Sequence, residues 1–390
     1  MTQSDEQRLV LHVGPHKTAT TYMQTNFARL RPRLAQAGWI YPDAVGIQSG
    51  IPEAHHDLAY RAETYFWPNR DNHHQLTRLA NLLQQNGKNL LLSAEGFSMW
   101  SLPQYLRLAD ILGFHRIEVA YALRDPVALL HSYWAEEVKQ GMTASFPDRI
   151  AGATLDPLGS RLLNPLLDLN PLIASDRITL RLIPFEVLKA NDIDLFSHFC
   201  SEILNIDALK PRIKTHVNAG FPIEQTEFLR MMTLMRCDGQ SNVGPAFRMA
   251  FIQNTTPAER RHWNAQIRTA AADARQHLDI PADAFFRLAI EGRVTTRAGR
   301  YCTLAPQGGA LFNRQDKTLA FYDDYRFWHN PVVKALALHV IDRLTATPIR
   351  PARPKTSANR PGHQPDPAPN TKATVNPSSG SPKEAEHAAE

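Results

Sequence analysis

Three short segments of the chain contain residue types that can bind or transfer an anionic group. The first is Leu11-His-Val-Gly-Pro-His-Lys-Thr-Ala-Thr-Thr21, in which an apolar run ends at Gly14 and a lysine and threonines follow. Backbone N–H groups at such a turn, with the positive end of a helix dipole, form an anion site. Lys17 adds a charge, and hydroxyl donors come from Thr18, Thr20 and Thr21. The alternative is an ordinary strand–turn–helix unit capped by threonines.

This segment is not the phosphate loop of nucleotide triphosphatases. That loop has one glycine directly before its lysine and another five residues further back, where this chain has His16 and Leu11. The turn is therefore that of a shorter phosphate loop.

The second segment places a carboxylate directly after an apolar run. Glu95 follows Asn89-Leu-Leu-Leu-Ser-Ala94. If the run is a buried strand, Glu95 lies at the floor of the crevice beyond the strand and can act as general base toward a hydroxyl group. Two alternatives are a ligand to magnesium-bound water and a cap on the following helix.

The third segment is Tyr121-Ala-Leu-Arg-Asp-Pro-Val-Ala-Leu-Leu-His-Ser132. Arg124 leaves an apolar strand, Pro126 begins a helix, and Ser132 follows about two turns along. An arginine fork and a hydroxyl group can hold one phosphate between them. Taken alone, however, the segment favours an ion pair of Arg124 with Asp125 or a neighbouring carboxylate.

Alternating strands and helices are needed to bring these segments together. The sequence predicts strands at 9–13, 89–93, 117–123 and 177–183, and helices at 20–30, 103–112, 126–139, 196–204 and 224–235. This order is typical of an α/β three-layer sandwich, a central parallel β-sheet covered by helices on both faces. Ligands of such sheets bind beyond the carboxyl ends of the strands, where all three segments fall.

We expect one α/β domain over residues 1–349 and a tail over 350–390. The motifs lie within 8–235, and the part from 236 to 349 is predicted to be mostly helical with loops. From Pro351 to Glu390 the chain is rich in proline, and its only large aliphatic residue is Val375. Such a composition cannot bury enough apolar surface to become ordered, so the tail is predicted to be disordered, solvated and without function.

The composition is that of a soluble globular protein, with 43% hydrophobic and 21% charged residues, which excludes a fibre and a wholly disordered chain. A formal charge of +5 is too small to indicate nucleic-acid binding, but it suits a small polyanion at one basic site. The three cysteines indicate neither a disulfide framework nor a zinc site. Without a signal peptide or an apolar run of membrane-spanning length, we expect a cytoplasmic protein.

The combined segments resemble the sulfotransferases that use 3′-phosphoadenosine 5′-phosphosulfate (PAPS), whose fold is related to that of the P-loop nucleotide triphosphatases. That family pairs a His-Lys-Thr-Gly-Thr-Thr or Pro-Lys-Ser-Gly-Thr-Thr loop with an arginine followed eight positions later by serine. Here His16-Lys-Thr-Ala-Thr-Thr21 is similar to the loop, and Arg124 and Ser132 to the second element. The run Ser132 to Gly141 is similar to that of the bacterial branch, and Ile183-Pro-Phe-Glu-Val-Leu188 to the end of the family's fourth strand.

The resemblance implies transfer of a sulfuryl group from PAPS to a hydroxyl group, in line and without a metal. Lys17 would stabilise the departing oxygen, and the 5′-phosphate would be held by residues of the loop, namely Gly14, Thr18, Ala19, Thr20 and Thr21. Arg124 and Ser132 would hold the 3′-phosphate. The base would be Glu95, with His16 as the second candidate. The implied acceptor is a carbohydrate, because the bacterial branch commonly sulfates glycans; a small alcohol, a lipid headgroup and a protein tyrosine stay open.

The chain also departs from the family. Ala19 replaces the usual glycine, which is expected to keep the backbone farther from the 5′-phosphate. No glycine-rich basic loop for the 3′-phosphate is evident; the stretch from Gly292 to Arg300, with Arg297 or Arg300, is the substitute we consider. The pairs His55-His56 and His73-His74 do not indicate a metal, because adjacent residues do not share a helix face. They are expected to line the acceptor cleft or to lie at the surface.

Two other functions fit parts of the sequence. In a kinase-like phosphoryl transferase, Lys17 and Thr18 would bind phosphate and magnesium, and Glu95 would be the metal-site acid. That assignment leaves Arg124 and Ser132 without a role. A non-catalytic nucleotide-binding module is the second, and Ala19 is its only support in the sequence.

Overall fold

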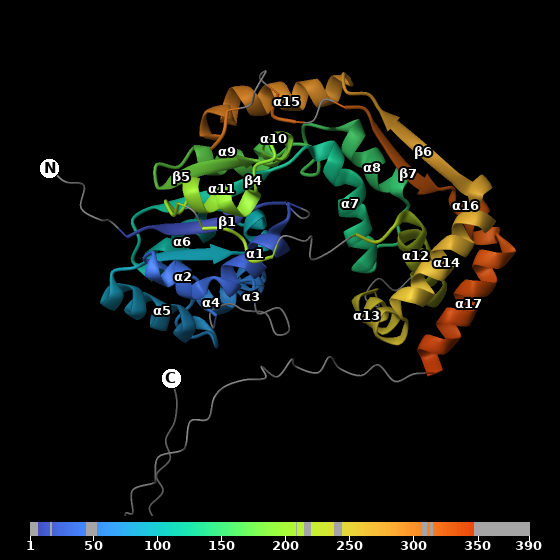
Figure 1. Cartoon of the computed structure of the whole chain (residues 1–390), viewed down its shortest axis with the longest axis horizontal. Coiled ribbons are helices and arrows are strands. Elements are labelled where there is room, and N and C mark those ends of the chain that lie inside the picture. Colours follow the sequence, from blue (N-terminus) through green and yellow to red (C-terminus); the bar gives the residue numbers. More distant parts are fainter. Residues whose placement is uncertain are drawn as a thin grey trace, which may run out of the picture. The chain divides into compact units, whose positions relative to one another are not determined.

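The computed structural model describes residues 7–15, 18–43, 53–207, 209–213, 220–237, 244–305, 310–312 and 315–346 (Figure 1). The sequence predicts a parallel sheet, and the structure contains one of five strands in the order β2-β3-β1-β4-β5. This order was not predicted. The strands are β1 (Leu9–Val13), β2 (Trp39–Ile40), β3 (Asn89–Ser93), β4 (Ile117–Leu123) and β5 (Ile178–Pro184). The predicted disordered tail, residues 350–390, lies outside the described residues.

Strand β1 occupies the middle of the sheet. It pairs with β3 on one side, where His12 lies opposite Ser93, and with β4 on the other, where Val13 lies opposite Tyr121. Because all three strands are parallel, their carboxyl ends meet at the same edge of the sheet. The ends of the three candidate segments are therefore neighbours.

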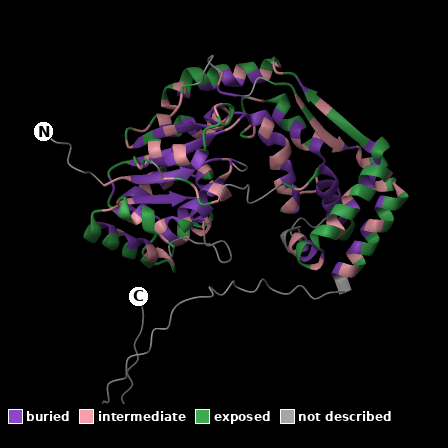
Figure 2. Ribbon diagram, viewed as in Figure 1, coloured by how far each residue is buried: buried purple, intermediate pink, exposed green. Residues whose placement is uncertain are grey.

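Both faces of the sheet are buried under helices, which makes three layers (Figures 1 and 2). Alternation along β1 shows this directly, because Leu9 and Leu11 belong to one hydrophobic cluster and Val10 to the other. One face is covered by α5 (His73–Asn86), α6 (Leu102–Leu112), α7 (Pro126–Lys139) and α9 (Leu166–Ile173). The other is covered by α1 (Thr20–Arg29), α2 (Arg31–Gln36) and α11 (Leu195–Glu202).

The helix boundaries follow from local residues. Helix α6 begins with a capping box between Ser101 and Gln104 and ends at Gly113, whose φ of 80° is one that glycine adopts without strain. Helix α7 begins at Pro126, after Asp125 caps the backbone N–H of Val127. Up to residue 190 the chain also contains the helices α3 (His56–Tyr60), α4 (Ala62–Phe66), α8 (Phe146–Leu155) and α10 (Phe185–Ala190) and the 3₁₀ helix η1 (Glu95–Met99).

The chain beyond β5 is mostly helical, as expected, but it also contains a two-stranded antiparallel ribbon that the sequence did not predict. The ribbon pairs β6 (Arg275–Ile280) with β7 (Lys317–Tyr322). Strand β6 carries exposed polar residues and lacks the apolar run by which the strands of the main sheet are recognised. Strand β7 does contain an apolar run, Leu319 to Tyr322, within a stretch that is predicted to be mostly helical. The helices here are α12 (Ile223–Cys237), α13 (Gly244–Asn254), α14 (Pro257–Ala270), α15 (Phe285–Ala298), α16 (Asp324–His329) and α17 (Pro331–Ala346), with short 3₁₀ turns η2 (Ala272–Ala274) and η3 (Gly299–Tyr301).

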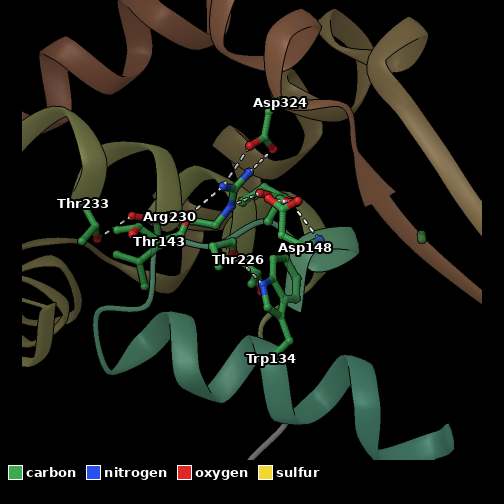
Figure 3. Close-up of polar contacts among 12 residues, drawn as sticks. Trp134, Thr143, Asp148, Thr226, Arg230, Thr233 and Asp324 are labelled. Carbon is green, nitrogen blue, oxygen red and sulfur yellow. Dashed lines mark hydrogen bonds and ion pairs between the residues drawn. The ribbon is translucent and has the colours of Figure 1, made fainter. Parts of the chain in front are cut away.

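A buried arginine ties this part to the segment that follows α7 (Figure 3). Arg230, on α12, is almost fully buried and forms ion pairs with Glu227 and Asp324. It also donates to the backbone carbonyl of Thr143 at 2.9 Å, and Trp134 donates to the carbonyl of Ala144 at 3.0 Å. The segment after α7 is thus fixed from both sides.

Candidate functional site

The loop between β1 and α1 (residues 14–19) turns sharply against strand β4. A Cβ atom on Gly14 would lie 2.9 Å from Oγ1 of Thr18 and 3.0 Å from Cβ of Ala122, so only glycine fits there. Thr18 is buried, and its hydroxyl donates to the carbonyl of Pro15 at 2.8 Å, which closes the turn. His16 and Lys17 of this loop lie outside the described residues.

Ala19 is the N-cap of α1 and adopts a left-handed conformation, with φ of 58° and ψ of 25°. An L-residue with a Cβ is strained there by about 1 kcal/mol relative to glycine. The family that the sequence resembles has glycine at this position, and the backbone found here is the one that glycine favours. No side chain caps the N-terminus of α1 within the described residues, so its first N–H groups face the turn without a hydroxyl or carboxylate cap.

A hydrogen bond joins the start of α1 to the end of β3. The hydroxyl of Thr20, which is buried, donates to Oε1 of Glu95, the first residue of η1. Thr21 is half-buried on the next position of α1. The Glu95 carboxylate therefore lies against the first turn of α1 and is only partly exposed.

A buried histidine on β1 lies near Glu95. Nδ1 of His12 is 2.8 Å from Oγ of Ser93, and burial lowers the pKa of His12 to about 4 although the charge of Glu95 acts in the opposite direction. His55 is also fully buried; its Nδ1 accepts the backbone N–H of Ser93 at 3.0 Å, and burial lowers its pKa to about 3. Both imidazoles are neutral at pH 7, so these two add no cationic charge near Glu95.

Arg124 extends from the end of β4 toward a carboxylate that follows β5. Its Nε lies 3.6 Å from Oε1 of Glu186, and its guanidinium lies over the ring of Phe185, 5.3 Å from the centroid. Oε2 of Glu186 accepts the backbone N–H of Asp125 at 2.9 Å. Burial raises the pKa of Glu186 to about 7 and lowers that of Arg124. For both groups, burial changes the pKa more than the charge of the partner does. An anionic ligand that paired with Arg124 would therefore displace Glu186, a carboxyl whose charged form is disfavoured by burial.

Sequence reasoning did not select Glu186 as a site residue, although it noted the segment Ile183 to Leu188. The signal was present: Glu186 is a carboxylate directly after a buried strand, in the same relation as Glu95 to β3.

The backbone beside Arg124 is fixed by a second ion pair. Asp125 is buried; its Oδ1 accepts the N–H of Val127 at 2.9 Å, and its Oδ2 lies 3.5 Å from the guanidinium of Arg287 on α15. A small pocket opens here between the start of α7 and α15, lined by this pair and by Phe286 and Ile290. Helix α15 thus holds the start of α7, and with it the position of Arg124.

Ser132 lies on α7 and is half-buried. Its hydroxyl donates to the backbone carbonyl of Leu129 at 3.1 Å, within its own helix. Any ligand contact would compete with this weak local bond. The basic stretch 292–300 is helical, because it falls within α15 and η3; Arg297 is exposed on α15, and Arg300 lies over the ring of Tyr301.

The three segments meet where the chain changes from one face of the sheet to the other. After β1 the chain enters α1 on one face, whereas after β3 and β4 it enters α6 and α7 on the opposite face. Adjacent strands whose connections leave in opposite directions form a crevice at their carboxyl ends. The described residues Thr18, Thr20, Glu95 and Arg124 all lie at this edge.

The described residues contain no group of three or more histidine, cysteine, aspartate or glutamate side chains able to hold a metal ion. In the same part of the chain, no helix has both the length and the apolar character needed to cross a membrane.

Comparison with known proteins gives one structural similarity. No protein-family model matches the sequence, and no curated protein matches it. A solved structure described as the sulfotransferase domain from the curacin biosynthetic pathway is similar over 68% of this chain and 98% of its own, with 13% sequence identity and a TM-score of 0.33.

Proposed function

We propose that the chain is a sulfotransferase that moves a sulfuryl group from PAPS to a hydroxyl group of a carbohydrate. The observation that supports this most is the meeting of three elements at one edge of the sheet: the β1–α1 loop, Glu95 and Arg124. An anion-binding turn, a carboxylate and an arginine at neighbouring strand ends are the parts that transfer to a hydroxyl group needs.

The arrangement suits a donor with two separated anionic groups. The β1–α1 loop follows β1 and Arg124 follows the neighbouring strand β4, so the two are adjacent but distinct. A nucleotide with phosphates on both its 5′ and 3′ positions would engage both. A nucleoside triphosphate carries its phosphates in one chain and would leave Arg124 without a ligand.

The residues of the chain would divide the chemistry among them. The N–H groups at the start of α1, with Lys17 and Thr21, bind the 5′-phosphate, and Arg124 with Ser132 binds the 3′-phosphate. Glu95 takes the proton of the acceptor hydroxyl as its oxygen forms a bond to sulfur, and the bond from sulfur to the phosphate oxygen breaks. Lys17 neutralises the charge that grows on that oxygen. The products are the sulfate ester and adenosine 3′,5′-bisphosphate.

The donor assignment is tested by thermal unfolding of the full chain with adenosine 3′,5′-bisphosphate, with and without EDTA. Ligand at about 100 times its dissociation constant stabilises the folded state by roughly 2.7 kcal/mol. We expect a shift that EDTA does not change and that Lys17→Ala and Arg124→Met each remove. Arg177→Met is the matched control, because Arg177 pairs with Asp110 before the start of β5, at the opposite edge of the sheet. A shift with ATP and magnesium in place of the bisphosphate would contradict the proposal and support the kinase-like alternative.

A further inference from the structure

Tyr60 presents an exposed aromatic face beside the Glu95 segment. It is the last residue of α3, and its ring stacks on His56 with centroids 5.8 Å apart and planes at 17°. A second neighbour is Gly96: a Cβ added there would lie 2.8 Å from Cε1 of Tyr60. Despite both contacts Tyr60 stays 50% exposed. A large aromatic ring that is held in place and still half exposed is a ready surface for a ligand.

The position of Gly96 explains why the ring comes so close. Glycine at 96 lets the Tyr60 ring approach the backbone of η1 one residue after Glu95, where any side chain would displace it. Burial raises the pKa of Tyr60 to about 12, and the charges of Glu95 and Tyr133 act in the same direction. Gly96 directly follows Glu95, so the Tyr60 ring lies beside the segment that carries the proposed base.

Thr20 and Tyr60 reach the Glu95 segment from different elements. Thr20, at the start of α1, donates to Oε1 of Glu95, whereas the Tyr60 ring, from α3, packs on the next residue, Gly96. In-line transfer requires the acceptor to approach the sulfur from the side opposite the departing phosphate. If the β1–α1 loop holds the donor, the acceptor needs a contact on another element, and α3 supplies one in Tyr60.

We propose that the exposed face of Tyr60 binds the acceptor, and that the acceptor is a pyranose ring; this inference rests on the proposed function. A pyranose has an apolar C–H face, which packs on an aromatic ring, and a rim of hydroxyl groups. With the C–H face on Tyr60, the rim of hydroxyl groups would lie beside the segment that carries Glu95. A linear alcohol has no flat face and gains little from the ring.

The test measures binding by saturation-transfer NMR on the full chain saturated with adenosine 3′,5′-bisphosphate. The probes are methyl β-D-glucopyranoside, methyl β-D-galactopyranoside, phenol and 1-butanol. We expect at least one pyranoside to bind the original protein through its ring C–H protons. Tyr60→Ala should weaken that binding about three- to tenfold, and Tyr60→Phe, which keeps the ring, should weaken it less.

The chain offers a matched control. Tyr325 is 72% exposed and stacks on His329, four residues along the chain, just as Tyr60 stacks on His56. Tyr325→Ala should leave pyranoside binding unchanged.

The outcomes separate the two proposals. If the bisphosphate stabilises the protein but neither pyranoside binds, or if phenol binds more tightly than both, the acceptor inference is wrong and the donor assignment stands. Equal losses in Tyr60→Ala and Tyr325→Ala would also overturn it, because the effect would then be unspecific. If the bisphosphate itself does not bind, the proposed function fails first.

Discussion

The hydroxyl of Thr20 donates a hydrogen bond to Oε1 of Glu95, and this bond links helix α1 to the end of strand β3. Thr20 belongs to the motif for which the sequence suggests phosphate binding, yet in this structure its hydroxyl contacts the carboxylate. One residue of the turn proposed to bind the anion thus also contacts the group proposed to act as base.

Thr20→Val should destabilise the fold, because it removes the buried hydroxyl that donates to the partly exposed Glu95 carboxylate. Hydrogen bonds to charged groups contribute about 1.5–3 kcal/mol, and we expect a loss of about this size in urea unfolding. Thr20→Ser should recover most of it. Thr77→Val is the control, because the Thr77 hydroxyl is exposed and bonds only to the backbone of its own helix. Similar losses at both positions would show that the contact with Glu95 contributes nothing.

Ala19→Gly should raise the stability by about 1 kcal/mol, since it removes the strain of an L-residue with φ of 58°. Ala28→Gly, in the last turn of α1, should have the opposite effect and cost up to about 1 kcal/mol, because glycine is unfavourable in a helix. Thermal or urea unfolding of the two variants gives the comparison. A loss of stability in Ala19→Gly would mean that the left-handed conformation at this position is not populated.

The Glu186 carboxyl should make donor binding depend on pH. Burial raises its pKa to about 7 in the folded state, from an ordinary value of 4.5. The folded state therefore favours the neutral form: the stability that Glu186 contributes is fully present below pH 4.5 and is lost as pH rises through about 7. Above this pH the ionised Glu186 also competes with a phosphate for Arg124.

Glu186→Gln should accordingly bind adenosine 3′,5′-bisphosphate more tightly than the original protein at pH 8, with a smaller difference at pH 6. Comparison at each pH by calorimetry cancels the titration of the ligand itself. Glu63→Gln, at the surface of α4, is the control and should follow the original protein throughout. A ratio of affinities that stays constant from pH 6 to 8 would rule out Glu186 as the competing group.

Arg230→Met should be the most destabilising of these changes. Arg230 is buried with Glu227, whose pKa burial raises to about 7, and removal of the cation leaves that carboxyl uncompensated. Breaking a buried ion pair costs about 3–5 kcal/mol. A second substitution, Glu227→Gln, should recover part of this loss in urea unfolding. Arg177→Met removes an arginine whose ion pair with Asp110 is partly exposed, and a loss as small as that of this control would contradict the expectation.

The main sheet could be predicted because its strands are short apolar runs that end at recognisable residues. The bounds of β1, β3 and β4 match those predicted, and β5 is shifted by one residue. Strand β2 could not be found, because two residues, Trp39 and Ile40, carry no periodicity. Strand β6 of the ribbon was missed because Arg275, His277 and Asp279 are typical of a polar loop. Its partner β7 has only four consecutive apolar residues, which do not distinguish a strand from a buried helix segment.

The contacts of the site depended on more than the sequence shows. The position of Glu95 after a strand was readable, but its bond with Thr20 depends on β1 and β3 being neighbours, which no local pattern indicates. The same holds for Arg124 and Glu186, which belong to the neighbouring strand ends of β4 and β5. The roles predicted for His16 and Lys17 fall on residues outside those described and stay predictions.

The central place of β1 also has a consequence for how the protein is made. β1 leaves the ribosome first among the strands, yet its partner residue Ser93 lies 81 positions after His12, and the partners on β4 come later still. At a synthesis rate of about 5–20 residues per second, β1 waits for several seconds with its apolar residues unpaired. The β1–α1 loop can reach its final shape only when Ala122, against which Gly14 packs, has emerged. Assembly of the β1–α1 loop is therefore a late event of translation, and the nascent chain is most exposed to chaperones and to aggregation before β4 is complete.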